Sequence, residues 1–262
     1  MEIIGFALGL LIGISLGLIG SGGSILTIPI LVYVMHISPS QATVYSLFIV
    51  GISALMGSIK GARENLLDYR IALYFGLPSV ISIFMMRKFF IPLLPEKFFT
   101  ILDFTVTRDI FIMLAFAVLM ILASFSMIGK NPTADLTSVN ATKINIAGKG
   151  IFVGLLTGFV GVGGGFLIIP TLIFSAKLPM KNAVATSLVI ISLNSLIGFA
   201  GSLTDSNIDW SFLLAFTALA VIGIFAGMFL SKKMSNEKLK PAFGWFVLIT
   251  GIYILIKELI FK

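Results

Sequence analysis

The sequence predicts an all-α polytopic membrane protein built from two inverted repeats of about five helical segments each, with glycine-broken short helices near the membrane middle. Of the 262 residues, 58% are hydrophobic and only 11% are charged. Soluble domains carry about 45–50% apolar and about 25% charged residues, so we expect a multi-pass protein of the cytoplasmic membrane. The apolar runs cover about residues 3–19, 24–36, 41–59, 70–86, 110–128, 148–162, 165–176, 182–203, 210–230 and 241–260.

The charge pattern excludes several other classes of protein. The net charge is +7, but the 18 basic residues stand almost wholly in the short gaps between apolar runs, which is a signal for membrane orientation. We therefore expect the lipid bilayer, and no nucleic acid, as a partner. The chain has no cysteine and a single histidine, so we expect no metal, no cofactor and no enzymatic activity.

Two of the apolar runs are too short to cross a membrane. A spanning helix needs about 20 apolar residues, whereas runs 24–36 and 165–176 cover roughly 20 Å at about 1.5 Å per residue. Each starts directly after a cluster of glycine, GSGG at residues 20–23 and GVGGG at 161–165. Both are therefore predicted to be helices that begin inside the membrane.

The two glycine clusters belong to an internal repeat. Adding 141 to a residue number maps the first half of the chain onto the second without a gap. We therefore predict a first transmembrane repeat at 1–129, a connecting loop at 130–147 and a second transmembrane repeat at 148–262. The matched residues include Gly13, Gly17, Gly20, Gly22, Gly23, Pro29, Ala42, Ser46 and Asp68, which become Gly154, Gly158, Gly161, Gly163, Gly164, Pro170, Ala183, Ser187 and Asp209.

Basic residues in the loops predict that the repeats are inverted. The loop at 60–70 carries basic residues, whereas the equivalent loop at 201–211 carries none, so the two loops are expected on opposite sides of the membrane. An odd number of segments per repeat gives the same inversion. The loop at 87–109, which carries Arg87, disagrees with this assignment, and its stretch 88–104 is expected to lie at the membrane interface.

Paired broken helices are typical of secondary transporters, in which the substrate binds where the two breaks meet. A helix that starts inside the membrane leaves about four backbone N–H groups without partners and carries about half a positive charge there, so an anion satisfies it. The alternative is that the glycines serve only close helix packing, which we favour for Gly13, Gly17, Gly154 and Gly158. The predicted binding residues are Gly20, Ser21, Gly22, Gly23 and Ser24, with Gly161, Gly163, Gly164 and Gly165.

The third segment of each repeat adds polar side chains to otherwise apolar surroundings. Ser46 and Ser53 are seven residues apart, as are Ser187 and Asn194, so each pair shares one helix face, which is expected to look into the bundle. As a set, together with Thr186, they are predicted to line the substrate path. The alternative is hydrogen bonding between helices, worth about 1 kcal/mol or less for each residue.

The acidic residues all fall in loops or at segment ends. Asp68 and Asp209 each precede an aromatic residue and an apolar run, which favours a helix N-cap over a coupling role. Proton- and sodium-coupled carriers usually place a carboxylate within the membrane. Because none is evident, we expect a passive anion pathway or a substrate that carries its own proton.

These motifs resemble the TauE/SafE family of membrane permeases for sulfite and organosulfonates. The resemblance rests on GLIGSGGSILTIPIL and GFVGVGGGFLIIPTL, followed by QATVYSL and KNAVATSL. It implies transport of a small sulfur-containing anion, with the duplicated glycine motif and an Ala-x-x-Thr-Ser element as features of the family. This element is intact at Ala183, Thr186 and Ser187, but Tyr45 stands at the threonine position of the first repeat, which implies an unequal, bulkier pocket on that side.

We therefore predict a permease that exports a small anion, sulfite or an organosulfonate, by alternating access around a site at the repeat interface. One alternative is an anion channel, or a permease for small carboxylates that lack sulfur. Another is a non-conducting accessory subunit. The sequence leaves homo-oligomerisation open.

Overall fold

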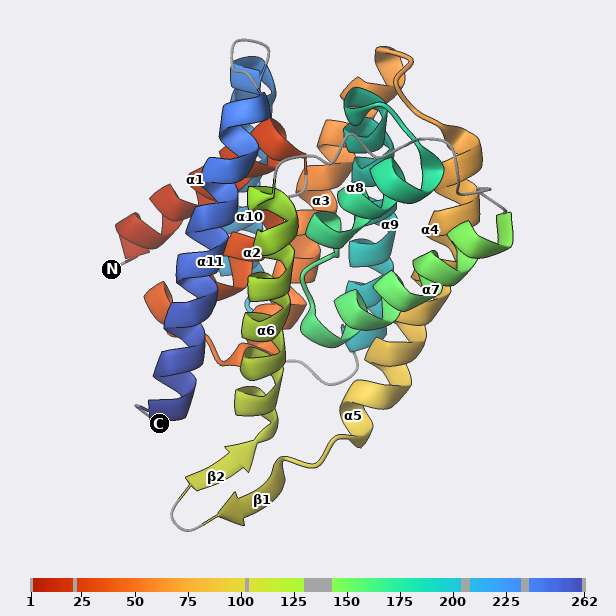
Figure 1. The fold of residues 1–262 in the computed structure, drawn as a ribbon. Coiled ribbons are helices and arrows are strands. Elements are labelled where there is room, and N and C mark those ends of the chain that lie inside the picture. Colours follow the sequence, from red (N-terminus) through yellow and green to blue (C-terminus); the bar gives the residue numbers. More distant parts are fainter. Residues whose placement is uncertain are drawn as a thin grey trace.

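The computed structural model describes residues 2–20, 23–101, 104–129, 143–203, 208–231 and 236–260 (Figure 1). Most of these residues are helical, and the predicted all-α polytopic fold is confirmed. The first half holds α1 (Glu2–Ile19), α2 (Gly23–Pro29), the π-helical η1 (Ile30–Val34), α3 (Pro39–Arg63), α4 (Tyr69–Met85), the π-helical η2 (Met86–Phe90), α5 (Ile91–Leu93) and α6 (Arg108–Ile128). The second half holds α7 (Lys143–Val160), α8 (Gly165–Ala176), α9 (Met180–Ser202), α10 (Trp210–Ser231) and α11 (Asn236–Ile260).

Six helices in the described part of the chain are long and apolar enough to cross a membrane. They are α3, α4 with its continuation to Leu93, most of α6, and α7, α9 and α10. Large apolar side chains on this bundle remain exposed, such as Leu122 at 60% and Phe229 at 62%. Because soluble proteins rarely expose apolar patches larger than a few hundred Å², lipid is the medium that this surface requires.

Two helix pairs approach closely through glycine, and the pairs are equivalent under the 141-residue shift. α1 packs against α10, and its counterpart α7 packs against α4, which is the counterpart of α10. A Cβ added at Gly13 would lie 2.8 Å from Gly223 Cα, and one added at Gly154 would lie 2.9 Å from Ser79 Cα. The predicted packing role of these two glycines is therefore confirmed.

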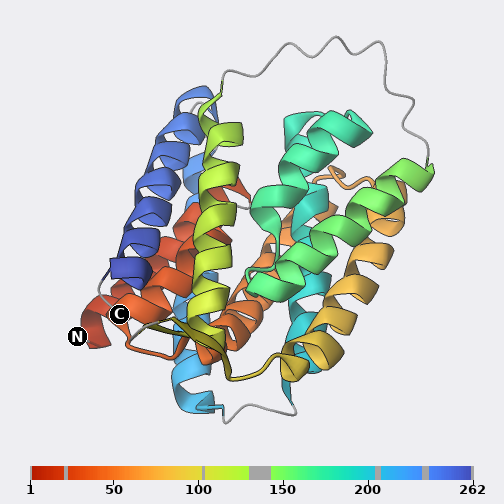
Figure 2. The ribbon, with the colours of Figure 1, turned by 60° about the horizontal axis from the view of Figure 1, so that its bottom comes forward.

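The repeat-mates α3 and α9 lie side by side in the middle of the bundle (Figure 1). Gly57 faces Leu188 whereas Gly51 faces Leu196, so residue numbers fall along α9 as they rise along α3. The two helices therefore run in opposite directions, as equivalent helices of inverted repeats must. The last helices of the two halves, α6 and α11, also pack against each other (Figure 2).

Asp68 and Asp209 cap the helices that follow them, as predicted. Asp68 Oδ1 accepts a hydrogen bond from the Ile71 amide at 3.0 Å, and Asp209 Oδ1 accepts one from the Phe212 amide at 3.1 Å. The two acceptors are 141 residues apart in the chain, and so are the two donors. The duplication therefore extends to single hydrogen bonds.

The stretch between α4 and α6 contains helix and strand where the sequence predicts a loop at 87–109, and its place at the membrane interface stays a prediction. α4 continues through η2 into α5, and a β-hairpin of β1 (Lys97–Ile101) and β2 (Phe104–Thr107) follows. Arg87 therefore stands on a helical segment and is buried, not in an exposed loop. Met85 and Met86 precede the charged pair Arg87-Lys88, and Phe89 and Phe90 follow it, so the segment as a whole is apolar enough for the helix to continue past the charges.

The second repeat starts with a helix that covers the same repeat positions as α1. Its first residue, Lys143, is Glu2 plus 141 and lies within the range expected for the connecting loop. Residues 130–142 of that loop lie outside the described residues.

Candidate functional site

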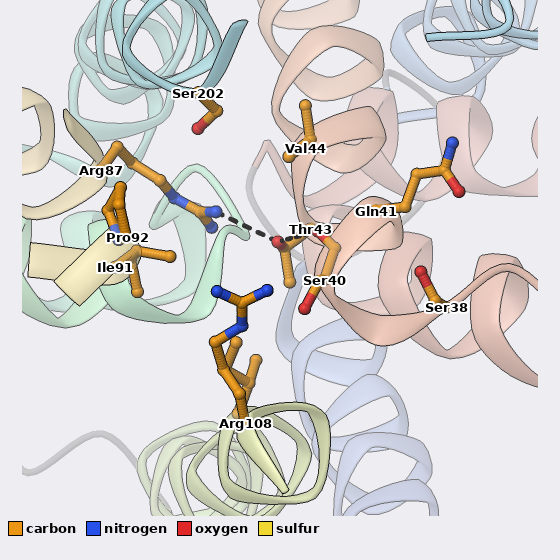
Figure 3. A pocket seen from close by; sticks show the side chains of 11 residues that line it. Ser38, Ser40, Gln41, Thr43, Val44, Arg87, Ile91, Pro92, Arg108 and Ser202 are labelled. Carbon is orange, nitrogen blue, oxygen red and sulfur yellow. Dashed lines mark hydrogen bonds between the residues drawn. The ribbon is translucent and has the colours of Figure 1, made fainter. Parts of the chain in front are cut away.

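A cavity of about 260 Å³ lies at the end of the bundle that carries the β-hairpin, here called the hairpin end (Figures 1 and 3). Its walls come from the start of α3, from η2 and α5, from the start of α6 and from the last residue of α9. We call it the arginine pocket because Arg87 and Arg108 both line it. None of the binding residues predicted from the sequence is among its lining residues.

Arg87 is buried at 3% exposure, yet most of its hydrogen-bonding capacity is unused. Its Nη1 donates to Thr43 Oγ1 at 3.1 Å, while Nε and Nη2 have no partner among the described residues. A buried charge without a partner is strongly destabilising, because its lost hydration is not replaced. The guanidinium is therefore placed to bind an acceptor that the described residues do not supply.

Arg108 brings a second positive charge to the same space. It is the first residue of α6, and its guanidinium points into the pocket toward that of Arg87 (Figure 3). The neighbouring Asp109 is engaged with α3, because its Oδ1 accepts hydrogen bonds from both the amide and the hydroxyl of Ser40. Two converging guanidinium groups form a site for an anion, which they bind through charge-assisted hydrogen bonds.

The rest of the pocket has a polar side and an apolar side. Thr43 and Ser202 place hydroxyl groups near Arg87, whereas Ile91 and Ile112 contribute apolar wall (Figure 3). Sites for drug-sized ligands usually enclose about 300–1,000 Å³, so this pocket suits a smaller molecule. Its lining fits a small anion that carries a short apolar part.

The second glycine cluster reaches Arg87 through Gly161. A Cβ added there would overlap Arg87 Nη2 and would lie 2.5 Å from Thr43 Cβ. Gly161 also has φ +80, a backbone conformation that residues with a side chain rarely adopt. The structure thus brings one predicted binding residue against the buried guanidinium, a contact that no pattern in the sequence predicts.

The other residues of the glycine clusters lie in several places. Gly163 packs against Ser195 of α9, Gly164 caps α8 in a left-handed conformation, and Gly165 begins α8. In the first cluster, Gly20 packs against Val184, and Gly23 and the buried Ser24 begin α2. Ser21 and Gly22 lie outside the described residues.

Three of the predicted polar residues are buried with atoms that lack partners. Ser46, Ser53 and Asn194 are fully buried, which confirms that these faces look into the bundle. Ser46 Oγ, Ser53 Oγ and Asn194 Oδ1 have no hydrogen-bond partner in the described part of the chain. Asn194 Nδ2 donates to Ser79 Oγ at 2.7 Å, so this residue also joins α9 to α4.

The two remaining predicted polar residues have structural partners. Thr186 Oγ1 accepts a hydrogen bond from the Asp68 amide at 3.0 Å, which ties α9 to the start of α4. Ser187 Oγ donates to the Val184 carbonyl at 2.8 Å within its own helix. For Thr186, hydrogen bonding between helices, the alternative to a role in the substrate path, is thus observed.

The repeat does not reproduce the chemistry of the arginine pocket on its other side. Gly161 corresponds to Gly20, but Thr43 corresponds to Val184 and Arg87 to Met228. A Cβ added at Gly20 would lie 2.5 Å from Val184 Cγ1, so the equivalent contact exists and is apolar. This cationic site is therefore confined to one end of the duplicated frame.

A second cavity, of about 360 Å³, adjoins the first, and Ser38 lines both. It contains Glu258 of α11, which is 1% exposed and whose Oε1 accepts a hydrogen bond from Tyr33 Oη at 3.0 Å. Glu258 lies near the end of its helix, as the sequence indicates, but it is enclosed by protein. The described residues contain no group of three or more side chains of the types that commonly bind metals.

Known proteins resemble this chain over almost its whole length. The family described as "Sulfite exporter TauE/SafE" matches residues 5–254. A "Probable membrane transporter protein" of Xylella fastidiosa is 29% identical over 252 residues, which cover 94% of this chain and 91% of that protein. "Probable membrane transporter protein YunE" of Bacillus subtilis is 28% identical over 251 residues, 88% of each chain. "Probable membrane transporter protein MJ0441" of Methanocaldococcus jannaschii is 24% identical over 263 residues, 95% of this chain and 93% of that protein. No solved structure matches the chain significantly.

Proposed function

Because the chain belongs to the TauE/SafE family of sulfite exporters, we propose that it exports sulfite or an organosulfonate across the cytoplasmic membrane. That it is a multi-pass membrane transporter follows from the family match and from its membrane-spanning helices. The observation that carries the proposal is the buried guanidinium of Arg87, whose Nε and Nη2 have no partner in the part of the chain that the structure describes, beside a cavity that Arg108 also lines.

The proposed substrate suits both sides of the arginine pocket. A sulfite or sulfonate group presents three oxygens, which accept the charge-assisted hydrogen bonds that Arg87 has left to donate. Thr43 Oγ1 already accepts from Arg87 and fixes the guanidinium for this contact. The short stem of an organosulfonate would lie against Ile91 and Ile112.

The proposed cycle is alternating access, with the repeats at 1–129 and 148–262 as the moving parts. Arg87 comes from the first repeat, while Gly161, which contacts it, comes from the second. Relative motion of the repeats would change this contact and so the exposure of a bound anion. We further propose that the path beyond the arginine pocket is lined by the glycine clusters and by the buried face that includes Ser53 and Asn194.

Flux measurements on purified protein in liposomes test the proposal. We expect sulfite or sulfoacetate to cross faster than in empty vesicles, and Arg87→Met to abolish the difference. Arg87→Lys keeps the charge but loses the planar group of N–H donors, so the flux through this variant should also fall at least about tenfold. Lys88→Met is the matched control, because it removes an exposed charge from the next position and should leave the flux unchanged.

The same measurements separate the proposal from its alternatives. Flux of acetate or chloride without flux of any sulfur anion would replace it with a carboxylate permease or an anion channel. Absence of all flux, together with co-purification of a stoichiometric partner, would indicate an accessory subunit. Unchanged sulfite flux in Arg87→Met would remove the arginine pocket from the transport path.

A further inference from the structure

We infer that a second station for the anion lies at the start of α8, where Ser195 faces Gly163, and that the anion reaches it from the arginine pocket along the loop 161–164. This inference rests on the proposed function, because it assumes that the anion enters at Arg87. It adds a binding position in the second repeat that the contacts of Arg87 do not include. The ligand is the same oxyanion in transit.

The loop between α7 and α8 connects the two positions. Gly161 contacts Arg87 and Thr43, and only two residues later Gly163 contacts Ser195 of α9. Consecutive Cα atoms are about 3.8 Å apart, so two residues span less than about 8 Å. An anion that leaves the guanidinium therefore needs to move only a short distance along this backbone.

Ser195 differs from the hydroxyl residues around it on α9. Ser187, Ser192 and Ser202 each donate to a carbonyl of their own helix, at 2.8, 2.8 and 3.0 Å. Ser195 is fully buried, and its Oγ has no partner among the described residues. Its Oγ is instead the atom that a Cβ at Gly163 would overlap. A buried hydroxyl without a partner is destabilising, which indicates that this one serves a ligand that is not always bound.

The start of α8 supplies the second attraction for an anion. α8 has 12 residues and begins after Gly164, whose φ of +79 turns the chain sharply into the helix. The first N–H groups of a helix lack partners within it and carry about half a positive charge. Ser195 Oγ contacts Gly163, two residues before the first residue of α8, so an oxyanion between them would meet both the hydroxyl and the positive end of the helix.

The surroundings of this spot make the station weak, as a transit position should be. Val50 and Ile191 lie 3.1 and 3.5 Å from the position of a Cβ at Gly163, and Ser195 Oγ would overlap it, so an anion would enter this spot only when the packing opens and would lose most of its water there. The three atoms nearest to that position belong to Ser195, Val50 and Ile191, none of which carries a charge. Transport requires binding that is strong enough for entry and weak enough for release. The repeat-mate of Ser195 is Ala54, so the first repeat lacks the equivalent hydroxyl.

Ser195→Ala tests the inference, with Ser192→Ala as the matched control on the same helix. Equilibrium binding of sulfite and sulfite flux in liposomes are measured for both variants and for Arg87→Met. We expect the affinity of Ser195→Ala for sulfite to stay within about twofold of that of the original protein, while its sulfite flux falls about fivefold or more. Ser192→Ala should change neither quantity, because its hydroxyl is already satisfied by the Val189 carbonyl.

Each contrary result has a defined meaning. Normal flux in Ser195→Ala would overturn the second station, and a parallel loss of binding would place Ser195 in the first site instead of a separate one. Normal sulfite binding in Arg87→Met would remove the arginine pocket from the proposed function, whatever Ser195→Ala shows. Removal of an unpartnered hydroxyl should leave thermal unfolding of the detergent-solubilised variant unchanged or raise its midpoint, so loss of fold does not confuse the result.

Discussion

The hydroxyl of Tyr45 accepts a hydrogen bond from the backbone amide of Asp209 at 2.8 Å. Under the 141-residue shift this bond is equivalent to that between Thr186 and the Asp68 amide, which measures 3.0 Å. A tyrosine in place of threonine therefore preserves a tie between repeats instead of abolishing it. Because α3 and α9 run in opposite directions, the two ties hold opposite ends of the bundle. Tyr45 is 2% exposed and lines neither of the two cavities described above, and the bulkier pocket on its side stays a prediction.

Loss of the Tyr45 tie should destabilise the protein. Tyr45→Phe removes only the hydroxyl and leaves the Asp209 amide without this partner, at a cost of about 1–3 kcal/mol. We expect a fall of a few degrees in the thermal unfolding midpoint of the detergent-solubilised protein. Tyr69→Phe, at a residue 71% exposed, is the control and should leave the midpoint unchanged. Equal midpoints for the two variants would show that the tie contributes nothing.

Ligand-dependent stabilisation should identify the arginine pocket without a transport assay. An anion that binds only the folded state stabilises it by about 2.7 kcal/mol at a hundredfold excess over its dissociation constant. At matched ionic strength, we expect sulfite or sulfoacetate to raise the unfolding midpoint and chloride and acetate to leave it unchanged. Arg87→Met should eliminate the shift, and Arg108→Gln should reduce it. A shift that persists in Arg87→Met would place the anion elsewhere.

A side chain at Gly161 should impair anion binding specifically. Gly161→Ala forces a Cβ into the position of Arg87 Nη2, at a φ of +80 that alanine disfavours. We expect the affinity for sulfite to fall at least about tenfold and the stability to fall by about 1 kcal/mol or more. Gly148→Ala is the control, because a Cβ there meets nothing within 4 Å. Full affinity in Gly161→Ala would mean that Arg87 binds the anion from a different position.

The hydrogen bond between Tyr33 and Glu258 should stabilise the junction of η1 with α11. Tyr33→Phe removes a donor from a buried carboxylate, and hydrogen bonds to charged groups are worth about 1.5–3 kcal/mol. We expect a larger fall in the unfolding midpoint than Tyr45→Phe gives, since the latter breaks a bond between neutral groups. If Glu258→Gln restores the midpoint in the Tyr33→Phe background, the cost is that of the poorly solvated charge. If it does not, the cost is that of the lost phenol hydrogen bond and does not depend on the charge of Glu258.

Local signals and internal repetition explain what could be predicted from the sequence. Asp68 and Asp209 act as caps through contacts three residues away, which the sequence shows directly. Arg87 was missed because its burial depends on Thr43 and Gly161, which come from distant parts of the chain. A signal was nevertheless present. Its repeat-mate Met228 falls inside an apolar run, which places position 87 at membrane depth.

The sequence does not show which hydrogen-bond partner each buried polar side chain has. Periodicity places Ser53 and Asn194 on interior faces, and both are fully buried, as is Thr186. It does not say that Thr186 Oγ1 accepts from the Asp68 amide while Ser53 Oγ has no partner among the described residues, because that depends on how the two repeats cross. The sequence therefore identifies the polar face of each helix, and only the packed structure separates its structural members from the rest.

The contact of Arg87 with Gly161 joins residues from the two halves of the duplication. A polypeptide that contained only the first half would have Arg87 without the loop that contacts it. One that contained only the second half would have the loop with Gly161 but no Arg87. If the chain is divided between α6 and α7, each fragment produced alone should therefore not bind the anion. The two fragments produced together in one cell should bind it again.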